Sequence, residues 1–183
     1  MKKENAVLYI LRLAVTLLTI CAVVALALAG ANAITKDLIA ANKAAKTTQA
    51  LAKVLPGVEG LEKMEMTGDA GIVTGLYGAG NSYAVEVAPN GFGGAITMMV
   101  GITDGKVVGI SIISHAETPG LGAVAGANTD KGVSFRDQFA GLIAGITIGD
   151  GDNQIDSLSG ATISSQAIVD GVNAALDYVA NLG

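Results

Sequence analysis

The chain has 183 residues, enough for one compact domain and a short appendage, and 51% of them are hydrophobic while only 15% are charged. A single cysteine, Cys21, and a single histidine, His115, exclude an internal disulfide, a Cys-ligated zinc site, an iron–sulfur cluster and a bis-histidine haem. The net charge of −5 is uneven: residues 1–54 carry seven Lys or Arg against two acidic residues, and the rest carries four against fourteen. An acidic domain argues against a nucleic-acid partner, because a phosphate backbone attracts a basic face. Because one cysteine and one histidine cannot form these metal centres, any redox chemistry in this chain needs an organic cofactor.

The amino-terminal segment is uniformly apolar. Residues Leu13 to Ala29 contain no charge, and with the flanking residues the stretch reaches about 20 residues, enough to cross a bilayer as a helix. We expect residues 1–33 to form a cytoplasmic start and a retained membrane anchor. A cleavable signal peptide ending near Ala31-Asn32-Ala33 and a buried core helix are the alternatives. Lys and Arg lie on both sides of the span, so counting them leaves its orientation open.

A second helical pattern follows the anchor. Residues 34–55 are rich in good helix formers, and Pro56-Gly57 then stops the helix. We interpret residues 34–55 as a stalk and residues 56–183 as the water-exposed domain.

Short alternating segments separated by turn residues predict strands after Pro56. The expected strands are Leu61–Met66, Ile72–Tyr77, Tyr83–Val87, Ala95–Ile102 and Lys106–Ser114. The last two flank Thr103-Asp104-Gly105, a strong hairpin signal because Asp-Gly tolerates the positive φ values of a tight turn. A short helix is expected at Phe135–Leu142, capped by Ser134, then a strand at Ile143–Ile148 and a final amphipathic helix at Gln166–Leu182. The fold class is α+β: one transmembrane helix, a mainly antiparallel sheet and a carboxy-terminal helix.

One candidate site lies directly before the final helix. Residues 156–165 place Thr162, Ser164 and Ser165 at a helix start, where free amides and the helix dipole favour an anion. Ser159, Gly160 and Ala161 precede them, and Gly160 and Ala161 have little bulk, so a large group could approach the Thr162 hydroxyl. On the residues alone, an ordinary Ser/Thr helix cap is the commoner interpretation.

A second candidate site is the segment His115-Ala116-Glu117-Thr118-Pro119-Gly120-Leu121-Gly122. Glu117 and Thr118 offer polar groups and Leu121 an apolar contact, while glycine and proline permit a close approach of the backbone to a flat ring. The alternative is a surface loop in which His115 is a hydrogen-bonded residue at the end of a strand.

These segments resemble motifs of the FMN-binding domain family, which occurs in the G subunit of Rnf complexes and in the C subunit of sodium-pumping NADH:quinone reductases. Asp156-x-x-Ser159-Gly160-Ala161-Thr162 is similar to the family's acceptor motif, and residues 115–122 resemble its H-x-E-T-P-G-L-G loop. Gly91-Phe92-Gly93-Gly94 and the stretch from Val100 to Lys106 follow the family's order upstream. The resemblance thus runs from about Gly91 to the carboxy-terminal helix, and the short length and single anchor look most like the Rnf G subunit.

The resemblance implies FMN joined through its phosphate to Thr162, with Ser159, Gly160, Ala161, Ser164 and Ser165 around the attachment point. It places the flavin beside His115, Glu117, Thr118 and Leu121. A separate transferase that uses FAD would attach the cofactor. No glycine follows Gly91-Phe92-Gly93-Gly94 as a nicotinamide fingerprint requires, so the protein would relay electrons without turnover of its own.

The implied setting is a membrane-bound, ion-translocating ferredoxin:NAD oxidoreductase with other membrane and iron–sulfur subunits as partners. The FMN domain would lie on the extracytoplasmic side of the cell membrane. The alternatives are a flavin relay in a Na⁺-translocating NADH:quinone reductase and a membrane-anchored binding module without flavin.

Overall fold

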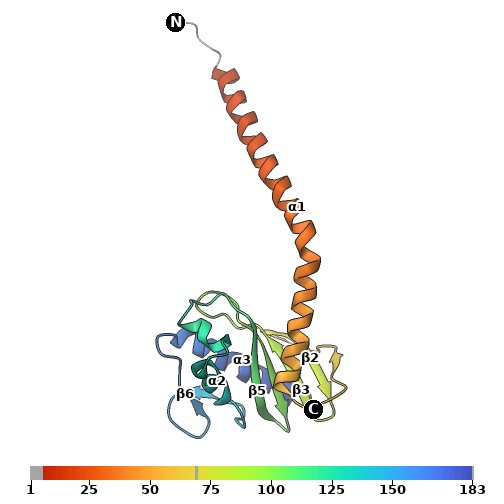
Figure 1. Cartoon of the computed structure of the whole chain (residues 1–183), viewed down its shortest axis with the longest axis vertical. Helices are drawn as coiled ribbons and strands as arrows, with labels where there is room; N and C mark the ends of the chain where they lie inside the picture. Colours follow the sequence, from red (N-terminus) through yellow and green to blue (C-terminus); the bar gives the residue numbers. More distant parts are fainter. Residues whose placement is uncertain (1–5, 69, 183) are drawn as a thin grey trace. The chain divides into compact units, whose positions relative to one another are not determined.

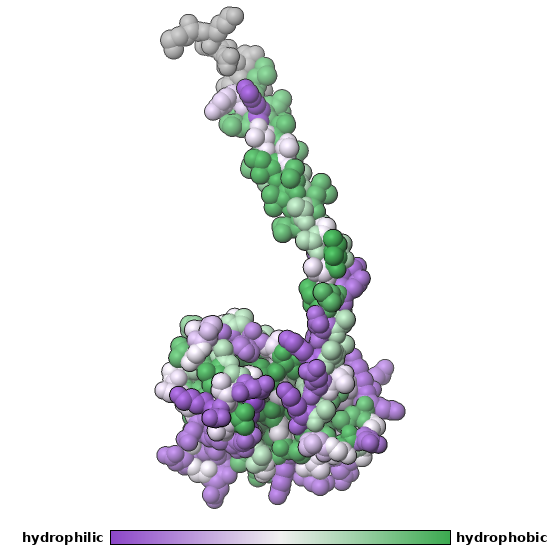
Figure 2. Space-filling model, viewed as in Figure 1, coloured by the Kyte–Doolittle hydropathy of each residue, from purple (hydrophilic) through white to green (hydrophobic). Residues whose placement is uncertain are grey.

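A computed structural model describes residues 6–68 and 70–182, so the first five residues of the expected cytoplasmic start lie outside it. Helix α1 runs without interruption over Ala6–Val54. At 1.5 Å per residue its 49 residues extend about 74 Å, more than twice the ~30 Å of a bilayer core. It contains a stretch long and apolar enough to cross a membrane, and that stretch is unburied. Figure 2 shows mostly hydrophobic residues on the visible side of this part of α1.

The globular unit begins at Lys46 and contains a five-stranded antiparallel sheet in the order β1-β2-β3-β4-β5 (Figure 1). Its strands are β1 (Glu62–Met64), β2 (Val73–Ala79), β3 (Ser82–Val87), β4 (Thr97–Thr103) and β5 (Lys106–Ser114). Thr103 pairs with Lys106, so Asp104-Gly105 is a two-residue turn, with φ values of 51° and 73°. This confirms the predicted hairpin.

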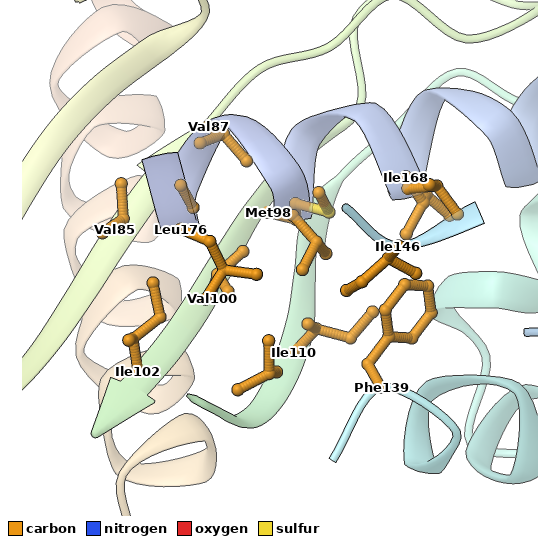
Figure 3. Close-up of a cluster of buried hydrophobic side chains, with 14 of the residues drawn as sticks. Val85, Val87, Met98, Val100, Ile102, Ile110, Phe139, Ile146, Ile168 and Leu176 are labelled. Carbon is orange, nitrogen blue, oxygen red and sulfur yellow. The ribbon is translucent and has the colours of Figure 1, made fainter. Parts of the chain in front are cut away.

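The main core lies between the sheet and helix α3, Thr162–Ala180. Side chains alternate along each strand, so Val85, Val87 and Met98 point to one face of the sheet. Ile168 and Leu176 of α3 pack onto this face, as Figure 3 shows. The α+β class and the carboxy-terminal helix are confirmed, but the helix begins at Thr162, four residues earlier than Gln166.

The opposite face of the sheet carries a smaller core made with the end of α1. Ala50, Val54 and Leu55 pack against a cluster that includes Ala84 and Met99. The helix ends at Val54, two residues before Pro56. The last turns of α1 are therefore part of the globular unit.

Two predicted elements are corrected by the structure. The helix expected at Phe135–Leu142 is α2, Asp130–Asp137, and its cap is Thr129, whose hydroxyl accepts a hydrogen bond from the Gly132 amide at 3.3 Å. Apolar residues continue at helical spacing beyond α2, but Phe139 enters the core from a turn that is not helical. The strand expected at Ile143–Ile148 shrinks to β6, Thr147–Ile148, paired in parallel with β7, Gln154–Ile155. A short 3₁₀ helix, η1, covers Gly122–Gly126.

Candidate functional site

Three segments that are far apart in the sequence meet around one cavity of about 360 Å³, a volume typical of small-molecule sites. The first segment is the loop 90–95, which we call the glycine loop; the second is the 115–121 loop; the third is the start of α3. The cavity is lined by Phe92, Glu117, Thr118, Leu121, Gly122, Gly160, Ala161, Thr162, Ile163 and Ser164.

Glu117 ties the three segments together. Its side chain is only 5% exposed, and its Oε1 accepts a hydrogen bond from the Gly93 amide at 2.9 Å. Its Oε2 accepts a short hydrogen bond from the Ser164 hydroxyl in the first turn of α3. Both oxygens of a buried carboxylate are therefore satisfied, by one donor from each neighbouring segment.

The approach of these segments leaves no space for side chains at two glycines. A Cβ at Gly93 would collide with the carbonyl oxygen of Ala116, and a Cβ at Gly122 would collide with Ser164 and the Glu117 carboxylate. Glycine is needed at both positions because only a residue without a Cβ allows the segments to pack this closely.

Helix α3 starts at the cavity without a side-chain cap. Its N-cap is Ala161, whose methyl group cannot accept a hydrogen bond, and Thr162 is the first helical residue, with an exposed side chain. Ser165 is buried and serves the preceding turn: its hydroxyl accepts from the Leu158 amide at 2.9 Å and donates to the Ala161 carbonyl at 3.0 Å. The Ser/Thr cap left open by the sequence is thus absent from this helix, and its amide end suits an anion.

The structure brings seven of the ten predicted site residues to the cavity wall, and they are Glu117, Thr118, Leu121, Gly160, Ala161, Thr162 and Ser164. Ser159, Ser165 and His115 do not line it. Sequence reasoning missed Phe92, Gly122 and Ile163 as lining residues. Phe92 and Gly122 lie inside the two glycine-rich motifs, and this position could have identified them as cavity residues.

His115 faces a separate, smaller cavity of about 240 Å³ that includes Lys46 and Gly126. Its Nδ1 accepts a hydrogen bond from the Glu117 amide at 3.3 Å, which fixes the backbone just before the buried carboxylate. His115 therefore positions the backbone at Glu117, and its side chain does not line the candidate cavity.

Arg136 of α2 contacts the segment that follows the 115–121 loop. Its guanidinium donates to the carbonyls of Ala125, at the end of η1, and Ala127, the latter at 3.0 Å. Burial lowers the pKa of Arg136, and the nearby Asp137 opposes this shift. The two hydrogen bonds join α2 to η1 and so hold the segment that follows Leu121.

Among residues 6–68 and 70–182, no group of three His, Cys, Asp or Glu side chains is placed to hold a metal ion. The cavity instead combines a helix amino terminus with exposed apolar side chains, a combination that suits a ligand with an anionic end and an apolar, flat body.

Residues 91–177 match the model of the FMN-binding domain family. Over 93% of its length the chain is 34% identical to the G subunit of the ion-translocating oxidoreductase complex of Methanosarcina acetivorans, of which the match covers 94%. It is 31% identical to the G subunit of the Na⁺-translocating ferredoxin:NAD⁺ oxidoreductase complex of Acetobacterium woodii, over 94% of this chain and 93% of that protein.

A shorter match, 40% identical over 99 residues, joins the chain to the G subunit of the proton-translocating ferredoxin:NAD⁺ oxidoreductase complex of Clostridium ljungdahlii. It spans 54% of this chain and about half, 53%, of that relative. Relatives from ion-translocating complexes, together with the unburied apolar part of α1, indicate a single-pass membrane protein.

Proposed function

We propose that this chain, which belongs to the family of G subunits of ion-translocating oxidoreductase complexes, carries FMN as a phosphoester on Thr162. The bound FMN would serve to relay electrons. The complex would be a membrane-bound ferredoxin:NAD oxidoreductase of the Rnf type. The observation that supports this most directly is Thr162 itself. It is an exposed hydroxyl residue at the first position of a helix without a side-chain cap, on the wall of the cavity.

The start of α3 suits a phosphate. The amides of the first helical turn and the helix dipole favour negative charge, and Ala161 supplies no competing acceptor. Gly160 adopts a φ of 73° and leads the chain into the helix without bulk at the attachment point. A phosphoester on Thr162 would therefore gain stabilisation from the helix end.

The remainder of the cavity suits the ring system. Phe92, Leu121 and Ile163 are apolar and exposed, which gives the cavity an apolar rim. Bound FMN would supply the electron transfer, and the protein would supply placement of the ring and the polarity around it. Glu117 and Ser164 would hold the wall between the two ends of the cofactor.

Attachment requires help from outside the chain. A threonine hydroxyl is a poor nucleophile without an activating base, so we assign this step to a separate flavin transferase that uses FAD. The Thr162 oxygen would form a bond to the phosphorus of the FMN half, AMP would leave, and the hydroxyl proton would be released. The chain itself would then act as an electron carrier between other membrane and iron–sulfur subunits, without a substrate of its own.

The test is expression of the full chain together with the flavin transferase, followed by a denaturing gel viewed under ultraviolet light. We expect a fluorescent band from the wild type and from Thr118→Val, which removes a different threonine from the same cavity. Thr162→Val should give none, and the wild-type peptide containing Thr162 should gain the mass of FMN less one water. Fluorescence in Thr162→Val would refute the attachment site.

The gel result and the proteins that co-purify with the loaded chain distinguish the alternative functions. A dark wild-type band would favour a membrane-anchored binding module without flavin. Co-purification of the loaded chain with iron–sulfur subunits that oxidise ferredoxin supports the Rnf assignment. Co-purification with a quinone-reducing complex would instead assign the relay to the NADH:quinone reductase.

We further propose that the FMN domain lies on the extracytoplasmic side, an assignment that rests on the resemblance because basic residues flank both ends of the span. The chain has one cysteine, in α1, which allows a clean test. The labelling uses a Cys21→Ser background and cells whose cell membrane is intact while any layer outside it is permeable. Val108→Cys in the domain should then react with a membrane-impermeant maleimide. Lys2→Cys should react only after the cells are lysed. The reverse pattern would contradict the proposed orientation.

A further inference from the structure

Phe92 is the largest apolar side chain on the cavity wall, and it is 69% exposed. Scattered exposed apolar residues are ordinary on protein surfaces. Here, however, Leu121, which is 43% exposed, and Ile163, which is 59% exposed, line the same cavity from two other segments. Three exposed apolar side chains that converge on one cavity form a surface suited to an apolar ligand.

The backbone on both sides of Phe92 is held firmly. Asn90 and Ala95 form an antiparallel bridge across the glycine loop, and the Gly91 amide donates to the Gly94 carbonyl at 2.8 Å. The Gly93 amide donates to Glu117. A Cβ at Gly91 would overlap the Glu117 carboxylate, so the loop lies tightly against the wall of the cavity.

This combination distinguishes Phe92 from a residue that stabilises its own loop. The loop is closed by backbone hydrogen bonds and by Glu117, and it buries little of the phenyl ring. An exposed aromatic ring on a rigid loop costs little conformational freedom when a flat ligand covers it. The ring contributes little to the packing of the fold itself, so its size calls for another explanation.

The start of α3 lines the same cavity and holds the proposed attachment point of the ligand. Thr162 and Ile163 begin α3, and a Cβ at Gly160 would lie 3.1 Å from Leu121, so the Leu121 side chain covers the turn before the helix. A cofactor bonded to Thr162 has its phosphate at the helix end. Its ring system would then lie among the apolar side chains of the cavity.

We propose that Phe92 is the aromatic wall against which the isoalloxazine of FMN bonded to Thr162 lies, and that it sets the orientation of the ring. This inference rests on the proposed function. Aromatic rings favour offset-stacked or edge-to-face contact, so the phenyl group restricts the angles that the tethered flavin adopts. Phe92 is a positioning residue, and neither the phosphoester nor the electron transfer requires its ring chemically.

Fluorescence provides the test because the chain contains no tryptophan, and the residues described around the cavity include no tyrosine. An indole in contact with a flavin quenches its emission by lending an electron to the excited ring, and the electron then returns, so no net reaction occurs. Phe92→Trp places such a quencher at the proposed wall. Because the native side chain is mostly exposed, the larger ring can be accommodated without repacking the core.

The full-length chain in detergent, loaded by the transferase, should show flavin emission several-fold weaker in Phe92→Trp than in the wild type, for equal covalent flavin, because the indole would contact the ring. Digestion to peptides should abolish the difference. Val108→Trp, on β5 and outside the cavity, is the matched control and should leave the emission unchanged.

Equal native emission from Phe92→Trp and the wild type would overturn the role of Phe92 while leaving flavin attachment intact. If the indole hinders loading, Phe92→Tyr carries the same test, because a phenol also donates an electron to the excited flavin. A wild-type chain that takes up no covalent flavin would overturn the proposed function, and this inference with it.

Discussion

The Ser164 hydroxyl donates a hydrogen bond to the Oε2 of Glu117, and both side chains are buried although 47 residues separate them in the sequence. This contact joins the 115–121 loop to the first turn of α3, and Glu117 extends it to the glycine loop through the Gly93 amide. Glu117 therefore links all three segments of the cavity wall through two hydrogen bonds.

Replacing Ser164 with Ala should destabilise the globular unit by about 1–3 kcal/mol, because one oxygen of a buried carboxylate loses its donor. The measurement is denaturant unfolding of the full chain in detergent, followed by the circular dichroism of the domain. Ser159→Ala, in the exposed turn before the helix, is the control and should change stability by less than about 0.5 kcal/mol. Equal stability of the two variants would show that the Ser164–Glu117 contact contributes little.

Substitutions of Glu117 should separate shape from hydrogen bonding. Glu117→Gln retains the shape and can accept from the Gly93 amide while donating to Ser164, so we expect a loss of about 1 kcal/mol. Glu117→Ala leaves both donors without an acceptor and should cost more. In the double variant with Ser164→Ala, the combined loss should be smaller than the sum of the two single losses, because both remove the same contact. Full additivity in the unfolding measurement would contradict this coupling.

Local patterns in the sequence predicted the elements whose formation depends on near neighbours. Asp104-Gly105 signalled the hairpin because both residues of the turn need positive φ, and the structure has them at 51° and 73°. The apolar spacing of Ile168, Val172 and Leu176 predicted the final helix, since these side chains cover the sheet.

Contacts between distant segments were not predictable in the same way. The motif pointed to Glu117 as a polar group beside a ligand, yet its role as an acceptor for Gly93 and Ser164 depends on how three segments meet. The position of α2 was missed because Phe139 shares the apolar spacing of a helix but is buried from the turn after it. The cap of α2 is Thr129, whereas the sequence pattern predicted Ser134.

The packing of α1 on the sheet can be tested at a pair of glycines that face each other across two strands. Gly101 of β4 pairs with Gly109 of β5. A Cβ at Gly101 would collide with the carbonyl group of Val54, whereas a Cβ at Gly109 would meet nothing within 4 Å. Gly101→Ala should therefore destabilise the unit by about 1–3 kcal/mol through forced separation of the helix end from the sheet.

Gly109→Ala is the matched control in the adjacent strand and should be neutral or slightly stabilising, since alanine restricts the unfolded chain more than glycine does. Protease cleavage near Leu51 should become faster in Gly101→Ala if the helix end loosens. Identical unfolding and cleavage of the two variants would mean that the last turn of α1 does not depend on the close approach to β4.

We expect the ionisation of Tyr77 in β2 to destabilise the globular unit at alkaline pH. Burial raises the pKa of its phenol above the ordinary value of 10.0, and the charge of Glu86 raises it further. The folded chain thus holds this proton more tightly than the unfolded chain, so its contribution is fully present below pH 10 and is lost as the pH rises toward the folded pKa. Tyr77→Phe cannot ionise, and the urea midpoint of the wild type should fall relative to that of the variant between about pH 10 and 11. The other tyrosines and lysines titrate in both proteins and cancel in this comparison. A constant difference between the two midpoints from about pH 9 to 11 would show that the Tyr77 phenol is not held in its neutral form by the fold.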